Sequence, residues 1–148
     1  AGNNFRNTEI NAVIGLSQLE RLDSANEKRR ANFRFFLEHL DEELFHTEFA
    51  VEGSCNYAFT LILRDADEGR CSRLMAALRD AKVEFRRGLS GGGNQLRQPY
   101  LRATFPADYH RLFPVAEHAH FYGFYIGNFP NLERWRIEQL CELVNRVR

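Results

Sequence analysis

Residues 55–63 read CNYAFTLIL, an uncharged run in which aromatic and branched side chains predominate. Such residues are enriched in strands, so the run predicts a central strand of a sheet. Two shorter segments of similar character follow: VEFR at 83–86 and FYGFYI at 121–126. Helical patterns separate the three segments. This order predicts an α+β domain, a small, mostly antiparallel sheet of about three strands packed with helices on one face.

The helical patterns on either side of the 55–63 strand have clear apolar spacings. Apolar residues spaced by three and four predict one helix that ends near Ala81 and a last helix over 132–147. A shorter helix is expected over 108–117, broken by Pro114. Upstream, Asn7 or Thr8 is expected to begin a helix over 10–22. The pattern Ser24-Ala-Asn-Glu27 is a capping box, which predicts that a second helix starts there and runs to about Leu40.

Composition and charge limit the function classes. The chain has 148 residues, enough for one domain with a real core, and its 20 basic residues balance 20 acidic ones. This balance argues against nucleic-acid binding, although eighteen of the basic residues are Arg, which suits phosphate or carboxylate contacts. No apolar run approaches the ~20 residues of a membrane span, so no membrane partner is expected. Three scattered cysteines fit reduced core thiols of a cytoplasmic protein.

The Gly-rich loop over 88–100 is the strongest candidate for a binding segment. Its glycines let the backbone approach a ligand, while Asn94 supplies an amide and Arg97 a forked cation. A flexible surface loop is the equal alternative. At the start of the chain, Gly2-Asn3-Asn4 places amides beside a helix N-terminus, where an anion is stabilised. Taken alone, this second pattern is weak evidence for a binding site, because many helices begin in this way.

Other catalytic and metal patterns are weak. His118 and His120, if they lie on a strand, share one face and could reach one metal ion. No third ligand stands at a suitable spacing, so we expect no metal site. The cysteines fall on apolar faces, and no nucleophile elbow, Walker loop or dinucleotide fingerprint is present. We therefore expect no catalytic residue in this chain.

Several segments together resemble one family. The stretch GNNFRNTEINAVIGLSQLERLD (2–23) is similar to the GYNxRxTExxAxIGxxQLxxLD segment of the DegT–DnrJ–StrS sugar aminotransferases. Residues 27–30 (EKRR) match the continuation of that segment, and FYIGNFPNL (124–132) resembles a late strand and its turn into the last helix. The loop GNQLRQPY (93–100) is similar to GNxxRQPY of the branch with the nucleotide-sugar 3-dehydrases.

The resemblance implies a fold and a cofactor. Members are fold-type I enzymes of deoxyamino-sugar biosynthesis that use pyridoxal 5'-phosphate (PLP), and this chain would be their C-terminal small domain. Residues 1–148 would form a single unit. Within it, leading helices over 1–40 would link to a missing N-terminal large domain, and 41–148 would form the α+β small domain. The Schiff-base Lys, or the His that replaces it in 3-dehydrases, would lie in that large domain, so we expect the fragment alone to be inactive.

The resemblance also assigns binding roles. Asn4 matches the residue that reaches the cofactor phosphate of the neighbouring subunit in a homodimer, although Asn3 replaces the usual Tyr. Asn94 and Arg97 match the loop on the side of the nucleotide-sugar substrate, and Arg6 matches a family Arg that would bind substrate or shape the contact between subunits. A different class stays open as the alternative, a stand-alone α+β ligand-binding or regulatory module that assembles through its aromatic surface.

Overall fold

The computed structural model describes residues 8–88, 93–101 and 104–147. Its three-stranded sheet has the order β1-β3-β2, and both pairings are antiparallel. The strands are β1 (Ala58–Ile62), β2 (Phe85–Arg86) and β3 (Gly123–Gly127). In the register, Thr60 lies opposite Tyr125 and Leu61 opposite Phe124. The predicted fold class, a small antiparallel sheet packed with helices, is confirmed.

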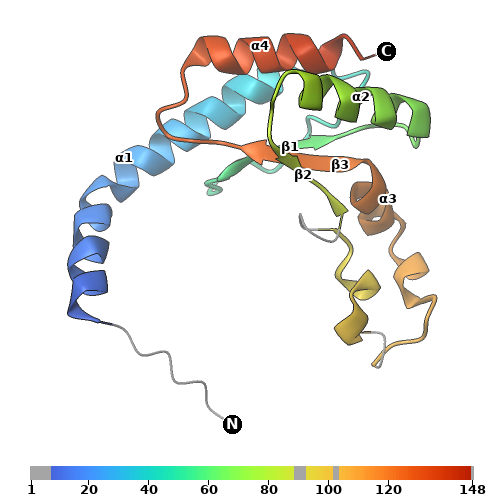
Figure 1. The fold of residues 1–148 in the computed structure, drawn as a ribbon, viewed down its shortest axis with the longest axis horizontal. Coiled ribbons are helices and arrows are strands. Elements are labelled where there is room, and N and C mark those ends of the chain that lie inside the picture. The colour runs from blue at the N-terminus through green and yellow to red at the C-terminus, as the bar shows by residue number, and fades with distance from the viewer. Residues whose placement is uncertain (1–7, 89–92, 102–103, 148) are drawn as a thin grey trace.

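Three helices cover one face of the sheet (Figure 1). They are α1 (Glu9–His39), α2 (Glu68–Asp80) and α4 (Arg134–Asn145). Alternation along the strands sends Phe59, Leu61 and Phe124 into the core beneath these helices, and the ring of Phe36 from α1 stacks on that of Phe59 at 4.6 Å. The described residues form no helix that is long and apolar enough to cross a membrane.

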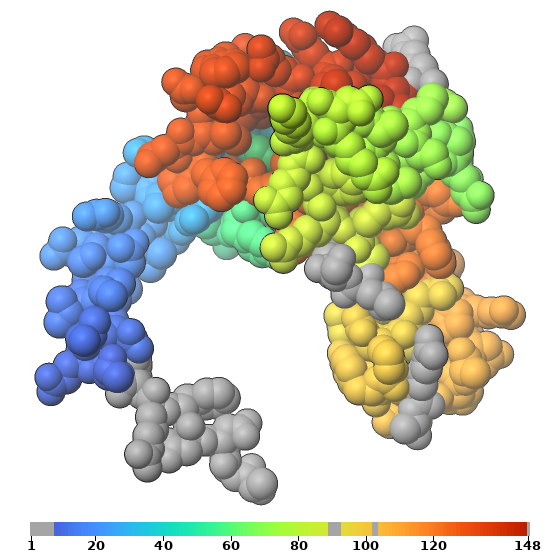
Figure 2. Space-filling view, viewed as in Figure 1, coloured from blue at the N-terminus to red at the C-terminus, as the bar shows by residue number. Residues whose placement is uncertain are grey.

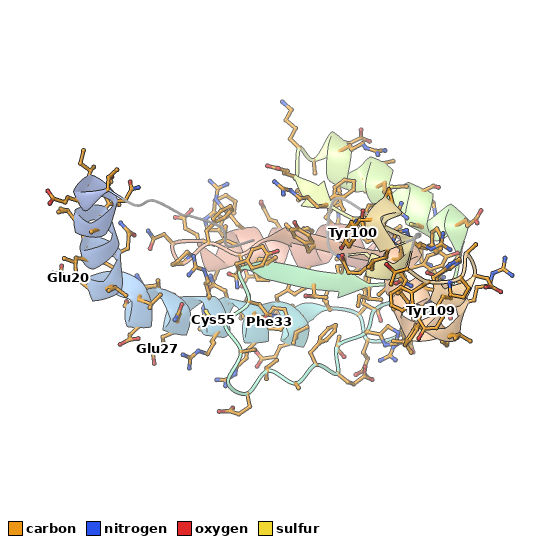
Figure 3. All side chains as sticks on the ribbon, turned by 90° about the horizontal axis from the view of Figure 1, so that it is seen from below. Glu20, Glu27, Phe33, Cys55, Tyr100 and Tyr109 are labelled. Atoms are coloured by element: carbon orange, nitrogen blue, oxygen red, sulfur yellow. The ribbon has the colours of Figure 1, made fainter. Side chains whose placement is uncertain are left out.

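The first helix differs from expectation. The predicted break at Ser24 is wrong, because α1 continues through it as one helix of 31 residues. The helix changes direction instead, between Glu20 and Glu27 (Figure 3). Its C-terminal half packs on the sheet, whereas apolar side chains of its N-terminal half are exposed: Ile10, Val13, Ile14, Leu16, Leu19 and Leu22.

A buried amide holds α1 against the end of β3. The side chain of Asn128, which is 1% exposed, donates to the carbonyl oxygens of Arg29 and Asn56, each at 2.9 Å. Its own Oδ1 accepts a hydrogen bond of 3.2 Å from the side chain of Asn32. One residue therefore joins the helix, the segment before β1 and the turn after β3.

The region after β2 forms a separate lobe below the sheet. It contains the 3-10 turns η2 (Gln95–Arg97), η3 (Pro99–Leu101) and η4 (Tyr109–Leu112), followed by α3 (Pro114–Tyr122). The prediction of a helix broken by Pro114 is wrong, because Pro114 occupies the first turn of α3, where its missing N–H costs nothing. Phe121 and Tyr122, expected in a strand, end this helix.

Figure 2 shows the resulting shape, an arch with a wide hollow beneath the sheet. The N-terminal half of α1 forms one side of the hollow and the lobe of η2, η3 and η4 forms the other.

Candidate functional site

The candidate site lies where the segment after β2 meets α3. Asn94 caps η2 by accepting a 3.0 Å hydrogen bond from the backbone N–H of Leu96 on Oδ1. Arg97 follows at the end of the same turn. Because Pro114 fixes the start of α3, Glu117 stands in the first helical turn, where the helix dipole favours a carboxylate.

The carboxylate of Glu117 binds both predicted residues. Its Oε1 accepts hydrogen bonds of 2.8 Å from the Asn94 side-chain amide and from Nε of Arg97, and its Oε2 accepts one of 2.5 Å from Nη2 of Arg97. The bidentate pair fixes the plane of the guanidinium. Arg97 also lies over the ring of Phe121, with its Cζ 4.7 Å from the centroid.

Hydrogen bonds, charge and burial shift the pKa values of this cluster. The hydrogen bond from Arg97 lowers the pKa of Glu117 to about 2, against the opposing effect of burial, with further help from Asn94. The same pair raises the pKa of Arg97. His110 of η4 places its Nε2 3.9 Å from Oε2 of Glu117 and is the second basic side chain at this carboxylate. Glu117 and Arg97 are therefore both ionised at neutral pH.

A second contact to α3 comes from the loop backbone. The N–H of Asn94 donates to Nδ1 of His120 at 3.1 Å, and the N–H of Gly93 donates to the carbonyl oxygen of Gly88 at 2.8 Å. A Cβ at position 93 would lie 2.2 Å from the imidazole Nδ1 and 2.6 Å from the Gly88 oxygen. Only glycine fits so close an approach, which gives Gly93 a packing role.

The predicted site residues divide into two groups. Asn94 and Arg97 are brought together through Glu117, whereas Asn4 and Arg6 lie outside the described residues. Sequence reasoning did not foresee Glu117 as their shared partner. Arg97 and Glu117 are twenty positions apart. The only feature of the sequence that pointed to Glu117 was an acidic residue three positions after Pro114.

The histidine pair does not form a metal site of the kind considered. The condition for a shared face, that His118 and His120 lie on a strand, is not met, because both lie on α3, where residues two apart point in different directions. His118 places Nε2 2.6 Å from the carbonyl oxygen of Leu63, while His120 faces Asn94. Among residues 8–88, 93–101 and 104–147, no three His, Cys, Asp or Glu side chains gather as metal ligands.

Two cavities flank the sheet. One of about 430 Å³ lies on the face without helices, where Thr60 and Tyr125 project, and it reaches Gly93 and Ala119 beside the candidate site. The other, about 710 Å³, lies at the β2 edge between the sheet and α4, with an apolar lining that includes Phe85 and Leu140. The smaller cavity therefore places the open face of the sheet next to Gly93, the residue before Asn94.

Two known proteins are similar to this chain in sequence. The lipopolysaccharide biosynthesis protein RfbH of Salmonella typhimurium is 33% identical over 104 residues, which are 68% of this chain and 23% of that protein. The GDP-perosamine synthase of Escherichia coli O157:H7 is 24% identical over 153 aligned positions, 97% of this chain and 37% of that protein.

A solved structure gives the same result in three dimensions. The E. coli GDP-4-keto-6-deoxy-D-mannose-3-dehydratase with bound hydrated PLP superimposes with a TM-score of 0.82 at 25% identity, covering 97% of this chain and 36% of that one. The chain thus spans less than two-fifths of the length of each of these three relatives. The sequence model of the DegT/DnrJ/EryC1/StrS aminotransferase family matches residues 1–145, and the chain belongs to this family.

Proposed function

We propose that this chain is the C-terminal small domain of a PLP-dependent nucleotide-sugar aminotransferase or 3-dehydratase. The observation that carries the proposal is the superposition on about a third of a dehydratase that holds PLP, together with the family match over 1–145. Residues 1–40 are the connection to a large domain, and residues 41–148 are the α+β unit. The relatives named for GDP-perosamine synthesis and lipopolysaccharide biosynthesis support a nucleotide-sugar substrate.

The described residues do not by themselves fit PLP. A site for the cofactor phosphate needs several converging amide or cationic donors, whereas Asn94 donates its side-chain amide to Glu117 and Arg97, with two of its five N–H groups on the same carboxylate, is a single cation. The two lysines are exposed. Lys28 lies on the surface of α1, and Lys82 takes a left-handed conformation (φ 56°) in the turn after α2. We therefore place the catalytic groups in the proposed large domain and derive no reaction step from this chain.

The chain contributes binding and orientation in this proposal. When bound, PLP supplies an electron sink for carbanion chemistry. Arg97 has five N–H donors, of which Glu117 takes one on Nε and one on Nη2, so an oriented guanidinium retains capacity for a substrate oxygen. Asn94 stands beside it. Arg6 is proposed to join them on the substrate side, and Asn4 to bind the cofactor phosphate of a partner subunit.

The exposed N-terminal half of α1 supports the proposal that another domain or subunit packs against it. Ile10, Val13 and Leu16 are 72, 67 and 64% exposed, which is a costly arrangement for apolar residues in water. We propose that the large domain or the second subunit of a homodimer covers this face. The open sheet face with Thr60 and Tyr125 would then line a closed active site rather than solvent.

Purification of the complete protein that contains this chain provides the test. We expect it to retain PLP, seen by visible absorbance, and to act on GDP-4-keto-6-deoxy-D-mannose with glutamate present. Amine incorporation at the sugar identifies an aminotransferase, and loss of the 3-hydroxyl identifies a dehydratase. A complete protein that binds no PLP and leaves such nucleotide sugars unchanged contradicts the proposal.

A variant pair tests the role of the loop. Arg97→Ala should raise KM for the nucleotide sugar by about 10- to 100-fold, the loss of one charge-assisted contact. Arg146→Ala is the matched control, since Arg146 forms an exposed ion pair with Glu142 on α4. Equal KM values for the two variants would contradict a substrate role for Arg97.

A further inference from the structure

Two side chains of α3 hold the loop that carries the proposed substrate residues. Four hydrogen bonds run from Asn94 and Arg97 to this helix, and all four end on Glu117 or His120. Glu117 takes side-chain donors. His120 alone of the two takes a backbone donor, the N–H of Asn94, at the point where the loop comes closest to the helix.

The direction of this bond fixes the protonation state of His120. A backbone N–H can only donate, so Nδ1 must carry a lone pair and the ring must be neutral with its proton on Nε2. Asn94 and His120 are 7 and 9% exposed, so water does not readily replace the bond. A proton on Nδ1 would put two donors 3.1 Å apart and break the contact.

We propose that His120 is a positioning residue whose neutral imidazole keeps Asn94 and Arg97 in place, and whose protonation releases the loop. The assignment of a substrate to this loop rests on the proposed function; the positioning itself rests on the geometry. The absence of space for a Cβ at Gly93 supports it, because it shows that the loop backbone lies directly against the His120 ring.

The surrounding charges favour the neutral ring. Burial is the main cause that lowers the pKa of His120 from its ordinary 6.5, and Arg97 of η2 and Arg87 after β2 lower it further. The negative charge of Glu117, on the same helix, raises the pKa of His120. Glu117 also contacts Arg97 and His110. Protonation of His120 therefore takes place below pH 6.5, and the loop should loosen as the pH falls through the lowered pKa.

Amide hydrogen exchange of the 148-residue chain tests the positioning directly. In the wild type, we expect the Asn94 amide to be protected at pH 7 and to lose protection, beyond the intrinsic pH dependence, as the His120 ring titrates by NMR. His120→Phe should speed exchange at Asn94 by at least about tenfold, the loss of one buried hydrogen bond. His120→Gln, which keeps an acceptor that does not titrate, should remove the extra pH dependence.

His118→Gln is the matched control, because His118 lies on the same helix and contacts Leu63 rather than the loop. It should leave exchange at Asn94 within about twofold of the wild type, since no bond to the loop is lost. Equal exchange in wild type and His120→Phe overturns the proposal. If that variant does not fold, wild-type protection at Asn94 that is insensitive to titration of His120 overturns it equally.

Kinetics of the complete enzyme separate this proposal from the proposed function. If both are right, KM for the nucleotide sugar rises below pH 6.5 in wild type, with a smaller change in kcat, and His120→Gln flattens this limb. If exchange at Asn94 responds to His120 but neither His120→Phe nor Arg97→Ala changes KM, the positioning stands and the substrate assignment fails. If KM rises equally below pH 6.5 in the wild type and in His120→Gln, His120 has no positioning role in the enzyme.

Discussion

Asn128 and Arg29 are 99 positions apart in the sequence, yet the side-chain amide of Asn128 donates to the carbonyl oxygen of Arg29 at 2.9 Å. The Arg29 guanidinium returns a contact of 3.4 Å from Nε to the carbonyl oxygen of Asn128. This reciprocal pair joins α1 to the turn after β3. Because Asn128 is buried, its bonds have no easy substitute in water.

Asn128→Asp should therefore lower the free energy of unfolding by about 2–4 kcal/mol, because a carboxylate cannot donate to Arg29 or Asn56 and is buried beside their oxygens. Chemical denaturation measures the change. Asn11→Ala is the control; Asn11 is exposed on α1, and its side chain should matter by less than ~0.5 kcal/mol. If Asn128→Asp lowered the free energy of unfolding by less than ~0.5 kcal/mol, the hydrogen bonds of Asn128 would not hold α1 against the end of β3 as described.

Glu117→Gln should change the acid stability of the chain. The pKa of Glu117, about 2, lies below its ordinary 4.5, so its contribution to stability is complete above pH 4.5 and is lost as the pH falls towards 2. The variant should be less stable than wild type at pH 7, and the gap should narrow as the pH falls from 4.5 to 2. Unfolding followed at several pH values checks this.

Glu48→Gln serves as the comparison for that experiment. It removes an ion pair of 2.7 Å with Arg64, but the Glu48 side chain is 68% exposed, whereas that of Glu117 is 18% exposed. Solvent screens such an exposed pair. We expect the smaller effect at pH 7 from Glu48→Gln, and the opposite ranking would show that burial does not govern the strength of these pairs.

Gly93→Ala should displace the loop from α3. The new Cβ would overlap the His120 ring and the Gly88 carbonyl, so either the loop or the helix must move, at a cost of about 1–3 kcal/mol. Gly15→Ala provides the contrast, because nothing lies within 4 Å of a Cβ at that helical position. It should stabilise α1 by up to ~1 kcal/mol. Thermal unfolding of both variants would show opposite shifts in Tm.

Thiol labelling should distinguish the three cysteines. Burial raises the pKa of Cys141 to about 12 and also raises that of Cys71, so neither forms the reactive thiolate readily. Cys55 is only half-buried, before β1. At pH 8, a maleimide should modify Cys55 first, as located by mass spectrometry of peptides, and rapid modification of Cys141 in the folded chain would contradict the packing described.

The strands and the later helices could be predicted because their signals are local. Aromatic and branched residues marked β1, and apolar spacing marked α2 and α4. The prediction at Ser24 was wrong because a capping box lowers the free energy of a helix start without preventing the previous helix from continuing. The segment from Ile10 to Leu40 contains no proline, and backbone bonds of one long helix outweigh a single cap.

The candidate site was predictable only in part. Asn94 and Arg97 stood in a recognisable motif, but their hydrogen bonds depend on the placement of α3, which the strand-like residues Phe121 and Tyr122 obscured. These residues end a helix because Gly123 allows the chain to turn into β3 directly after them. Long-range pairs such as Arg97 with Glu117 arise from tertiary packing, which a single sequence does not encode in any short pattern.

The Asn128 junction has a mechanical consequence for α1. Arg29 and Glu9 are about 20 positions apart, which is ~30 Å along the helix at 1.5 Å per residue, and the straight span is shorter because α1 changes direction between Glu20 and Glu27. The junction holds the base of this segment, so a tilt of only ~5° there moves the far end by up to roughly 2–3 Å, about the length of a hydrogen bond. If a large domain or second subunit covers that end, as proposed, its position there depends on two amide groups near the sheet, Asn128 and Asn32.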